Sequence, residues 1–197
     1  MVRLGGKFYG IFKKSSELNN SMDTTIKKLA EEIVQKYNPE NLAPFPFEDI
    51  EKQEDDLVIG GLELEDDIYG IIIFKEERNT FYIAVNKKIS PIKQYFTMAH
   101  ELGHFYLHKD EIKNNDNKLI DKSFEYEGYR ALFLLKENQI SKIERQANEF
   151  AINLLMPENL IKEVWDKLGN IESCAEIFVV SSSMMSSRLE ELELLES

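Results

Sequence analysis

Cysteine and long apolar runs are scarce in this sequence, and each scarcity excludes a class of protein. With one cysteine, Cys174, the chain cannot form an intramolecular disulfide. Its neighbours Ala175, Ile177 and Phe178 indicate a small, buried apolar position. No stretch approaches the roughly 18 consecutive apolar residues of a membrane-spanning helix. Residues 1–20 lack the apolar segment of a secretory signal. We therefore expect a cytoplasmic protein that does not contact a membrane.

Positive charge is also in short supply. The chain has 24 Lys and Arg against 36 Asp and Glu, which gives a formal net charge of −12. An acidic protein repels phosphate backbones, so direct nucleic-acid binding is disfavoured as its main role. Solubility is the simplest role of this charge. Two acidic runs, within residues 48–56 and 63–67, leave a basic partner surface open as an alternative.

What the chain does have is enough apolar material for one core. Hydrophobic residues make up 43% of 197 residues, which predicts one domain with a small appendage. We expect the domain over residues 1–168 and a helical, helix-turn-helix-like tail packed on it over residues 169–197. The predicted fold class is α+β, with a small antiparallel sheet packed against the histidine-bearing helix and a helical C-terminal part.

Hydrophobic periodicity and turn residues place the individual elements. Short β-type runs predict strands, with a hairpin turn at residues 76–79, over residues 57–59, 69–74 and 80–85. Helical spacing and capping residues predict helices over residues 23–37, 90–108, 141–156, 157–168, 172–178 and 182–195. The polar segment 109–122 indicates a surface loop. Residues 124–135 are aromatic and apolar and have no firm assignment.

The helix over residues 90–108 carries the pattern His-Glu-x-x-His. His100 and His104 lie four residues apart on one helical face, so both imidazoles can reach one ion. Zinc lowers the pKa of a bound water towards neutrality, and Glu101 can accept the proton that this water loses. All three histidines of the chain lie between positions 100 and 108. The pattern therefore indicates a catalytic zinc site.

Two plainer interpretations compete with this one. The histidines could be ordinary surface residues of a helix, although the capped, amphipathic context of the motif argues against that. They could also hold a structural zinc ion. Structural sites usually have four protein ligands, often cysteines, and this chain has no thiol cluster. A site with an open position for a hydrolytic reaction is therefore favoured.

The third ligand must come from elsewhere in the chain. His108 continues the spacing of four, but it lies about 12 Å along the helix axis from His100 at 1.5 Å per residue. Both cannot bind one ion at about 2 Å. We interpret His108 as a helix-end residue, a group that contacts a ligand histidine, or a substrate contact.

Glu144 is the better candidate for the third ligand. It shares a helical face with Ala147 and Asn148, and small residues on that face allow a close helix approach. Asn148 could hydrogen-bond a ligand imidazole and orient it. Ser141 and Glu144 also fit a capping box, in which Glu144 would bond back to the backbone. The residues alone do not decide between these roles, and Glu149 remains a rival ligand on another face.

Several segments resemble one known family, the ImmA/IrrE metallopeptidases. Residues 100–108 are similar to its H-E-L-G-H-x-x-L-H signature, and residues 96–99 to the F-T-L-A that precedes it. Residues 144–157 are similar to its E-x-E-A-N-x-F-A-x-x-L-L-M-P block, and residues 177–189 to its F-x-V-S…R-L tail. The resemblance covers about residues 86–192, roughly half the chain. The N-terminal half matches only loosely.

The resemblance implies a metal site of two histidines and one glutamate, with Glu144 as the matching third ligand. It also implies an intracellular, zinc-dependent peptidase that cleaves or inactivates a helix-turn-helix repressor, often in mobile elements or stress responses. The chain departs from the family pattern at Tyr95, where a basic residue is common, and at Gln146, where the block has its second glutamate. It also shows no fused repressor-type DNA-binding domain, so we expect the repressor to be a separate protein.

Three functions remain in competition. The first is a zinc endopeptidase, with another divalent metal as an alternative to Zn²⁺. The second is an anti-repressor module that binds its partner without cleaving it. The third is a DNA-binding regulator that uses the tail, in which Arg188 would be the base-reading cation. The acidic residues around Arg188 have the wrong charge for a helix that faces phosphates. A helical subdomain packed through apolar side chains is favoured there, with the contacts expected at Met184, Met185, Leu189 and Leu192.

Overall fold

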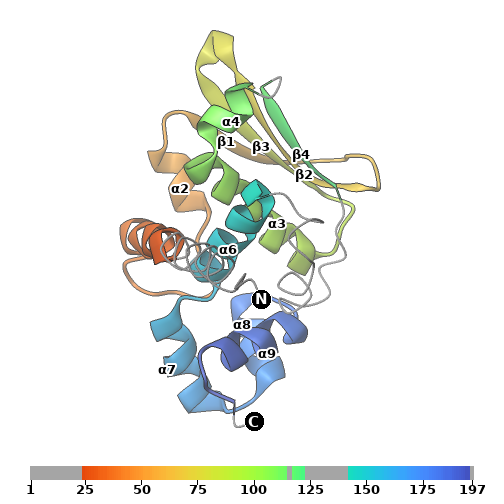
Figure 1. Ribbon diagram of the computed structural model, residues 1–197. Helices are drawn as coiled ribbons and strands as arrows, with labels where there is room; N and C mark the ends of the chain where they lie inside the picture. The colour runs from red at the N-terminus through yellow and green to blue at the C-terminus, as the bar shows by residue number, and fades with distance from the viewer. Residues whose placement is uncertain (1–23, 115–116, 123–141, 196–197) are drawn as a thin grey trace, which may run out of the picture.

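The computed structural model describes residues 24–114, 117–122 and 142–195. Its sheet has four strands in the order β1-β3-β2-β4 and lies at one end of the molecule (Figure 1). The strands are β1 (Leu57–Leu62), β2 (Ile68–Lys75), β3 (Thr80–Asn86) and β4 (Lys118–Lys122). The α+β fold class is confirmed. The sheet is mixed, because β1 runs parallel to β3 while β2 runs antiparallel to both β3 and β4.

The hairpin between β2 and β3 forms where the sequence predicts it. A short 3-10 turn, η1 (Glu76–Arg78), follows β2, and Asn79 closes it at φ 49°. Asparagine tolerates this left-handed backbone better than most residues do. The sequence therefore contained a local signal for the turn.

The prediction of a surface loop over residues 109–122 is wrong. The structure has α4 (Lys109–Asn114) and β4 in this segment. Ile112 of α4 is fully buried, and β4 pairs with β2. These long-range contacts are the physical reason for the error, since the local sequence is polar and gives no periodic signal. Residues 124–135 lie outside the described residues.

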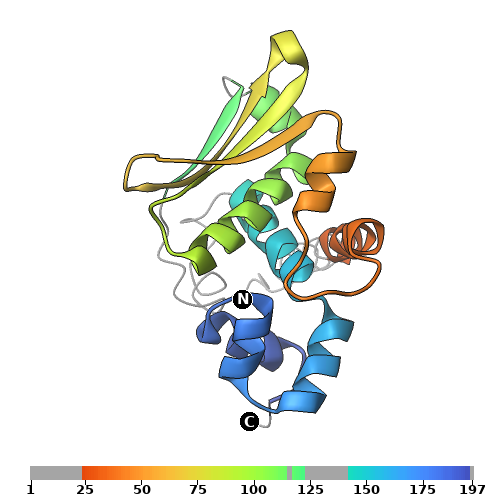
Figure 2. The same cartoon turned by 180° about the vertical axis from the view of Figure 1, so that it is seen from behind.

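Helix α3 (Pro91–Leu107) is central to the described fold. Its start matches the prediction, because Ser90 accepts a hydrogen bond from the backbone of Lys93 and Pro91 occupies the first turn. One side of α3 packs against β2 and β3, and another side packs against α6 (Lys142–Leu155) (Figure 2). Helix 24–37 and α2 (Glu48–Gln53) complete this half of the molecule.

The C-terminal part consists of α7 (Glu158–Leu168), α8 (Ile171–Phe178) and α9 (Ser182–Glu191). These helices lie at the end of the molecule opposite the sheet (Figure 1). Met184, Met185 and Leu189 are buried and Leu192 packs against the core, as predicted. Helix α9 is shorter than expected. The boundary expected at residue 168 stays a prediction.

Cys174 is buried, as its apolar neighbours predicted. Within the described ranges, no helix combines the length and apolar character needed to cross a bilayer.

Candidate metal centre

The packing of α3 against α6 brings together three side chains that could hold a metal ion, here called the metal-binding group. His100 and His104 project from α3, and Glu144 projects from the first turn of α6. One ligand atom from each lies within 4.8 Å of the others. Both histidines are almost fully buried, whereas the Glu144 side chain is 26% exposed. The group is therefore enclosed by protein on the histidine side.

Gly103 allows α3 and α6 to approach each other closely. A Cβ added at Gly103 would lie 2.9 Å from both the Cα and the carbonyl oxygen of Ala147. These are backbone atoms of α6, which cannot move aside independently of the helix. Gly103 of α3, which has no side chain, thus faces the small residue Ala147 of α6. Glu144 lies one helical turn before that contact.

The distances within the group fit one metal ion. The Nε2 atoms of His100 and His104 are 3.0 Å apart. The Glu144 carboxylate oxygens lie 3.2 Å from Nε2 of His100 and 3.4 Å from Nε2 of His104. Tetrahedral zinc with bonds of about 2.0–2.1 Å separates its ligand atoms by about 3.3–3.4 Å. Two imidazoles and a carboxylate are also ligand types that zinc commonly takes.

The hydrogen bond of His100 is compatible with metal binding. Nδ1 of His100 lies 2.8 Å from Oδ1 of Asn148, which is an acceptor, so Nδ1 carries the proton. Nε2 then directs its lone pair towards His104 and Glu144. The sequence suggests Asn148 as a group that could orient a ligand imidazole, and the structure places it in contact with His100.

The protonation states of the group also suit a metal. Burial is the main cause that lowers the pKa of His104 to about 4, so this imidazole is neutral at pH 7. Burial alone would raise the pKa of Glu144, but hydrogen bonds and charge interactions with His100 and His104 lower it well below its usual range. The group therefore presents a neutral imidazole at His104 and an ionised carboxylate at Glu144.

Glu101 is fully buried between α3 and the sheet. A Cβ added at Gly70 of β2 would lie 2.4 Å from Oε1 of Glu101 and 2.6 Å from Cγ2 of Thr97. The carboxylate thus packs directly against the backbone of a strand. It can lie there because residue 70 has no side chain.

The other candidates from the sequence occupy different positions. His108 is not part of the metal-binding group, and its Nδ1 lies 3.0 Å from Nδ1 of His104. Glu149 is also outside that group. Ser141 of the predicted capping box lies outside the described residues, and the Glu144 carboxylate contacts both histidines.

Two residues near the site were not recognised as important from the sequence. Gly70 gave a weak signal, as a glycine inside an otherwise apolar strand. Gln146 departs from the family pattern, and the sequence indicates no role for it. Its Oε1 lies 3.1 Å from Nε2 of His108. Both roles depend on contacts between elements that are far apart in the sequence.

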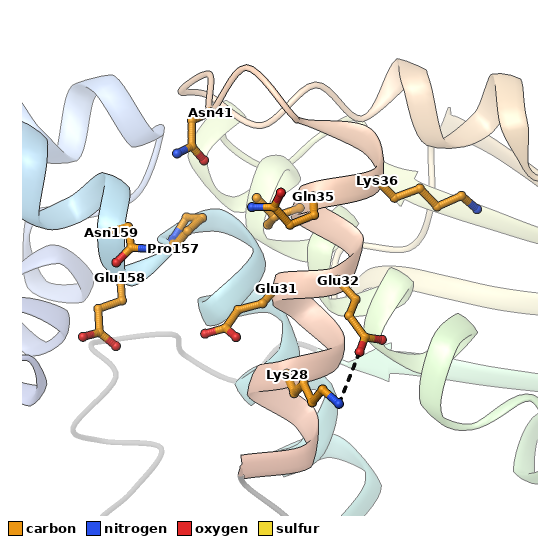
Figure 3. A pocket seen from close by; sticks show the side chains of 10 residues that line it. Lys28, Glu31, Glu32, Gln35, Lys36, Asn41, Pro157, Glu158 and Asn159 are labelled. Atoms are coloured by element: carbon orange, nitrogen blue, oxygen red, sulfur yellow. Dashed lines mark ion pairs between the residues drawn. The ribbon is translucent and has the colours of Figure 1, made fainter.

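A separate surface hollow lies between helix 24–37 and the start of α7 (Figure 3). It has a volume of ≈ 750 Å³ and is lined mainly by charged and amide side chains, including Glu31 and Glu158. Lys28 and Glu32 form an ion pair of 3.7 Å at its edge. None of the metal-binding residues lines it. The hollow is therefore distinct from the metal centre.

Two buried histidines and a carboxylate that could hold one metal ion define a metal-dependent class of protein, and Glu101 follows His100 directly in α3. The chain belongs to the family of the IrrE N-terminal-like domain, whose sequence model matches residues 67–190. The resemblance to ImmA/IrrE metallopeptidases is thereby confirmed. Membership in this family also implies a bound metal ion.

Individual relatives agree with this assignment. The chain is 36% identical over 96 residues to the radiation response metalloprotease IrrE of Deinococcus radiodurans, an alignment covering 49% of this chain and 25% of that protein. The same protein of Deinococcus deserti is 37% identical over 87 residues, covering 44% and 26%. The chain thus aligns with about a quarter of these two relatives.

Two further proteins are similar over more of the chain. Uncharacterized immunity region protein 2 of Bacillus phage phi105 is 27% identical over 145 residues, covering 74% of this chain and 77% of that protein. A solved structure, a Mycobacterium tuberculosis transcriptional regulator, aligns with a TM-score of 0.48 and 16% identity. That alignment covers 86% of this chain and 47% of the regulator, and it is too weak to support a functional comparison.

Proposed function

We propose that this protein is a zinc-dependent endopeptidase. The observation that carries the proposal is the convergence of ligand atoms of His100, His104 and Glu144 to within 4.8 Å of one another. The buried Glu101 follows His100 directly in α3. These three residues would hold the ion, with another divalent metal as the alternative to Zn²⁺. The bound ion would act as a Lewis acid that polarises the scissile carbonyl and acidifies water.

Glu101 would act as the general base and then as the general acid. Its carboxylate would accept a proton from the attacking water and return it to the leaving amine. Burial between α3 and β2 restricts the carboxylate to few positions. Asn148 would hold the His100 ring in its binding orientation through the 2.8 Å hydrogen bond.

The proposed substrate is a separate, cytoplasmic helix-turn-helix repressor. Two findings support this choice: the membership in the IrrE-like family and the similarity to an immunity region protein of a phage. The acidic charge of the chain would suit a partner with a basic, DNA-binding surface. The same family relationship supports a proposed role in a mobile element or a stress response.

An anti-repressor that binds without cleavage is the second candidate function. It needs partner binding and makes no use of Glu101 as a base. A DNA-binding regulator is less well supported, since the cation expected to read bases, Arg188, is 1% exposed.

The first experiment compares wild type with Glu101→Gln. Both zinc-loaded proteins are incubated with the helix-turn-helix repressor encoded nearest to the gene of this chain, and products are identified by mass spectrometry. We expect cleavage by wild type alone, with equal zinc content and equal repressor binding in both. If both proteins inactivate the repressor without new peptides, the anti-repressor function replaces the peptidase.

The second experiment tests the ligand set. Glu144→Ala should bind zinc far more weakly than wild type, because two imidazoles alone form an incomplete site. Zinc content after gel filtration, measured by elemental analysis, provides the result. Full zinc occupancy in the variant would remove Glu144 from the ligand set.

A further inference from the structure

A chain of hydrogen bonds leads from the metal centre to the surface of α6. Nδ1 of His104 lies 3.0 Å from Nδ1 of His108. Nε2 of His108 lies 3.1 Å from Oε1 of Gln146. His108 is 2% exposed, whereas Gln146 lies partly exposed on the first turns of α6. These hydrogen bonds thus connect the end of α3 to α6 at a second place, beside the metal-binding group.

The donor and acceptor chemistry of these groups fixes the direction in which the hydrogen bonds run. The amide oxygen of Gln146 only accepts, so Nε2–H of His108 donates to it. A neutral imidazole carries one N–H, so Nδ1 of His108 is left as an acceptor. Nδ1–H of His104 then donates to that acceptor.

The same direction prepares His104 for a metal ion. With its proton on Nδ1, His104 presents a lone pair on Nε2. That atom lies 3.0 Å from Nε2 of His100 and 3.4 Å from Oε1 of Glu144, inside the metal-binding group. If the hydrogen bonds ran in the opposite direction, Nε2 of His104 would carry a proton and could not bind a metal.

We propose that His108 and Gln146 are positioning residues that fix the tautomer and ring orientation of His104 and thereby strengthen metal binding. Neither residue belongs to the metal-binding group. The proposal rests on the metal site of the proposed function, and it assigns the final acceptor of the chain to Gln146. A glutamine can turn its amide and offer N–H instead of oxygen, so this acceptor is weaker than a carboxylate would be.

The first test measures zinc affinity by competition with a chromophoric chelator, without any substrate. Gln146→Met keeps the length of the side chain and removes its acceptor. We expect affinity to fall about 10-fold, within the range of losses seen when groups that support metal ligands are removed. Gln146→Glu, which can only accept, should bind at least as tightly as wild type. Gln35→Met, on the exposed side of helix 24–37, is the matched control and should equal wild type.

A double-mutant cycle separates positioning from a structural or charge effect. If Gln146 acts through His108, Gln146→Met should have no further effect in a His108→Ala background. Any gain from Gln146→Glu that persists in that background measures its added charge. Thermal unfolding of the metal-free proteins should be the same for Gln146→Met and wild type.

The outcomes distinguish this proposal from the proposed function. Zinc affinity of Gln146→Met equal to that of wild type overturns the positioning role and leaves the peptidase proposal intact. If Gln146→Met lowers zinc affinity equally with and without His108, the effect does not pass through the His108 hydrogen bonds, and the proposal is overturned. A wild type that binds no zinc overturns both proposals.

Discussion

Gly70 leaves the space that the carboxylate of Glu101 occupies. Since a Cβ at this position would meet both Oε1 of Glu101 and Cγ2 of Thr97, Gly70→Ala must displace one side chain or both. A shift of about 1 Å in a reacting group can cost about 100-fold in rate. We therefore expect repressor cleavage by Gly70→Ala to fall about 100-fold while its zinc content stays at the wild-type level.

A second substitution shows whether this effect is catalytic or only structural. Gly70→Ala should also lose about 1–3 kcal/mol of stability through overpacking. Thr97→Ser removes Cγ2, so the double variant should recover stability in urea unfolding. It should not recover cleavage, because the contact with Glu101 remains. Cleavage that returns together with stability would show that Gly70 only supports packing.

Part of the geometry of the site could be predicted from the sequence. The spacing of His100 and His104 is local, and one helical turn suffices to bring their rings to one side. Glu144 fits both a cap and a ligand, and only the packing of α6 on α3 directs its carboxylate to the histidines. The role of Gly70 could not be predicted, because it depends on which helix covers β2.

At the scale of elements, the contact between Gly103 and Ala147 sets the separation of α3 and α6. In an isolated helix, Gly→Ala stabilises by about 1 kcal/mol. Here the added Cβ would lie 2.9 Å from backbone atoms of α6, so the helices must move apart. We expect Gly103→Ala to lose about 1–3 kcal/mol of stability. We also expect zinc affinity to fall at least 10-fold, since the ligands are divided between the two helices.

Gly60→Ala on β1 is the matched control. A Cβ at that position meets nothing within 4 Å, and stability and zinc affinity should stay at the wild-type level. Urea unfolding and chelator competition measure the two quantities. Wild-type zinc affinity in Gly103→Ala would mean that the centre tolerates a wider separation of the helices.

Elements with local end signals were predictable, and elements formed by distant contacts were not. Ser90 caps α3, Gly169 ends α7 at φ 56° and Asn170 caps α8, so these bounds could be taken from the sequence. Strand β4 has polar residues and exists through its pairing with β2. The parallel pairing of β1 with β3 likewise depends on a connection that no local pattern specifies.

At the scale of the whole molecule, Arg188 ties the C-terminal helices to the end of α6. Its Nε and Nη2 donate to the carbonyl oxygen of Met156 at 3.2 and 3.1 Å, and Nη2 also donates to Oδ1 of Asn153 at 3.0 Å. Nη1 lies 2.8 Å from Oε2 of Glu191. The burial of this side chain contradicts the alternative in which Arg188 reads bases, which the charge of the tail already disfavoured. The physical reason is that α9 turns this side chain inward, where acceptors of α6 and the chain just after it take up the guanidinium.

Arg188→Met tests how strongly this connection holds the molecule together. Methionine retains apolar volume but leaves the Met156 carbonyl and Asn153 without a buried donor, which should cost about 2–4 kcal/mol. Arg78→Met, at an exposed position of the β2–β3 hairpin, should change stability by less than about 0.5 kcal/mol. Urea unfolding of both variants measures the difference. Because Arg188 lies inside the protein, the variant should also show the same weak DNA binding as wild type in a gel-shift assay. Unchanged stability together with a selective loss of DNA binding would instead assign the tail to DNA recognition.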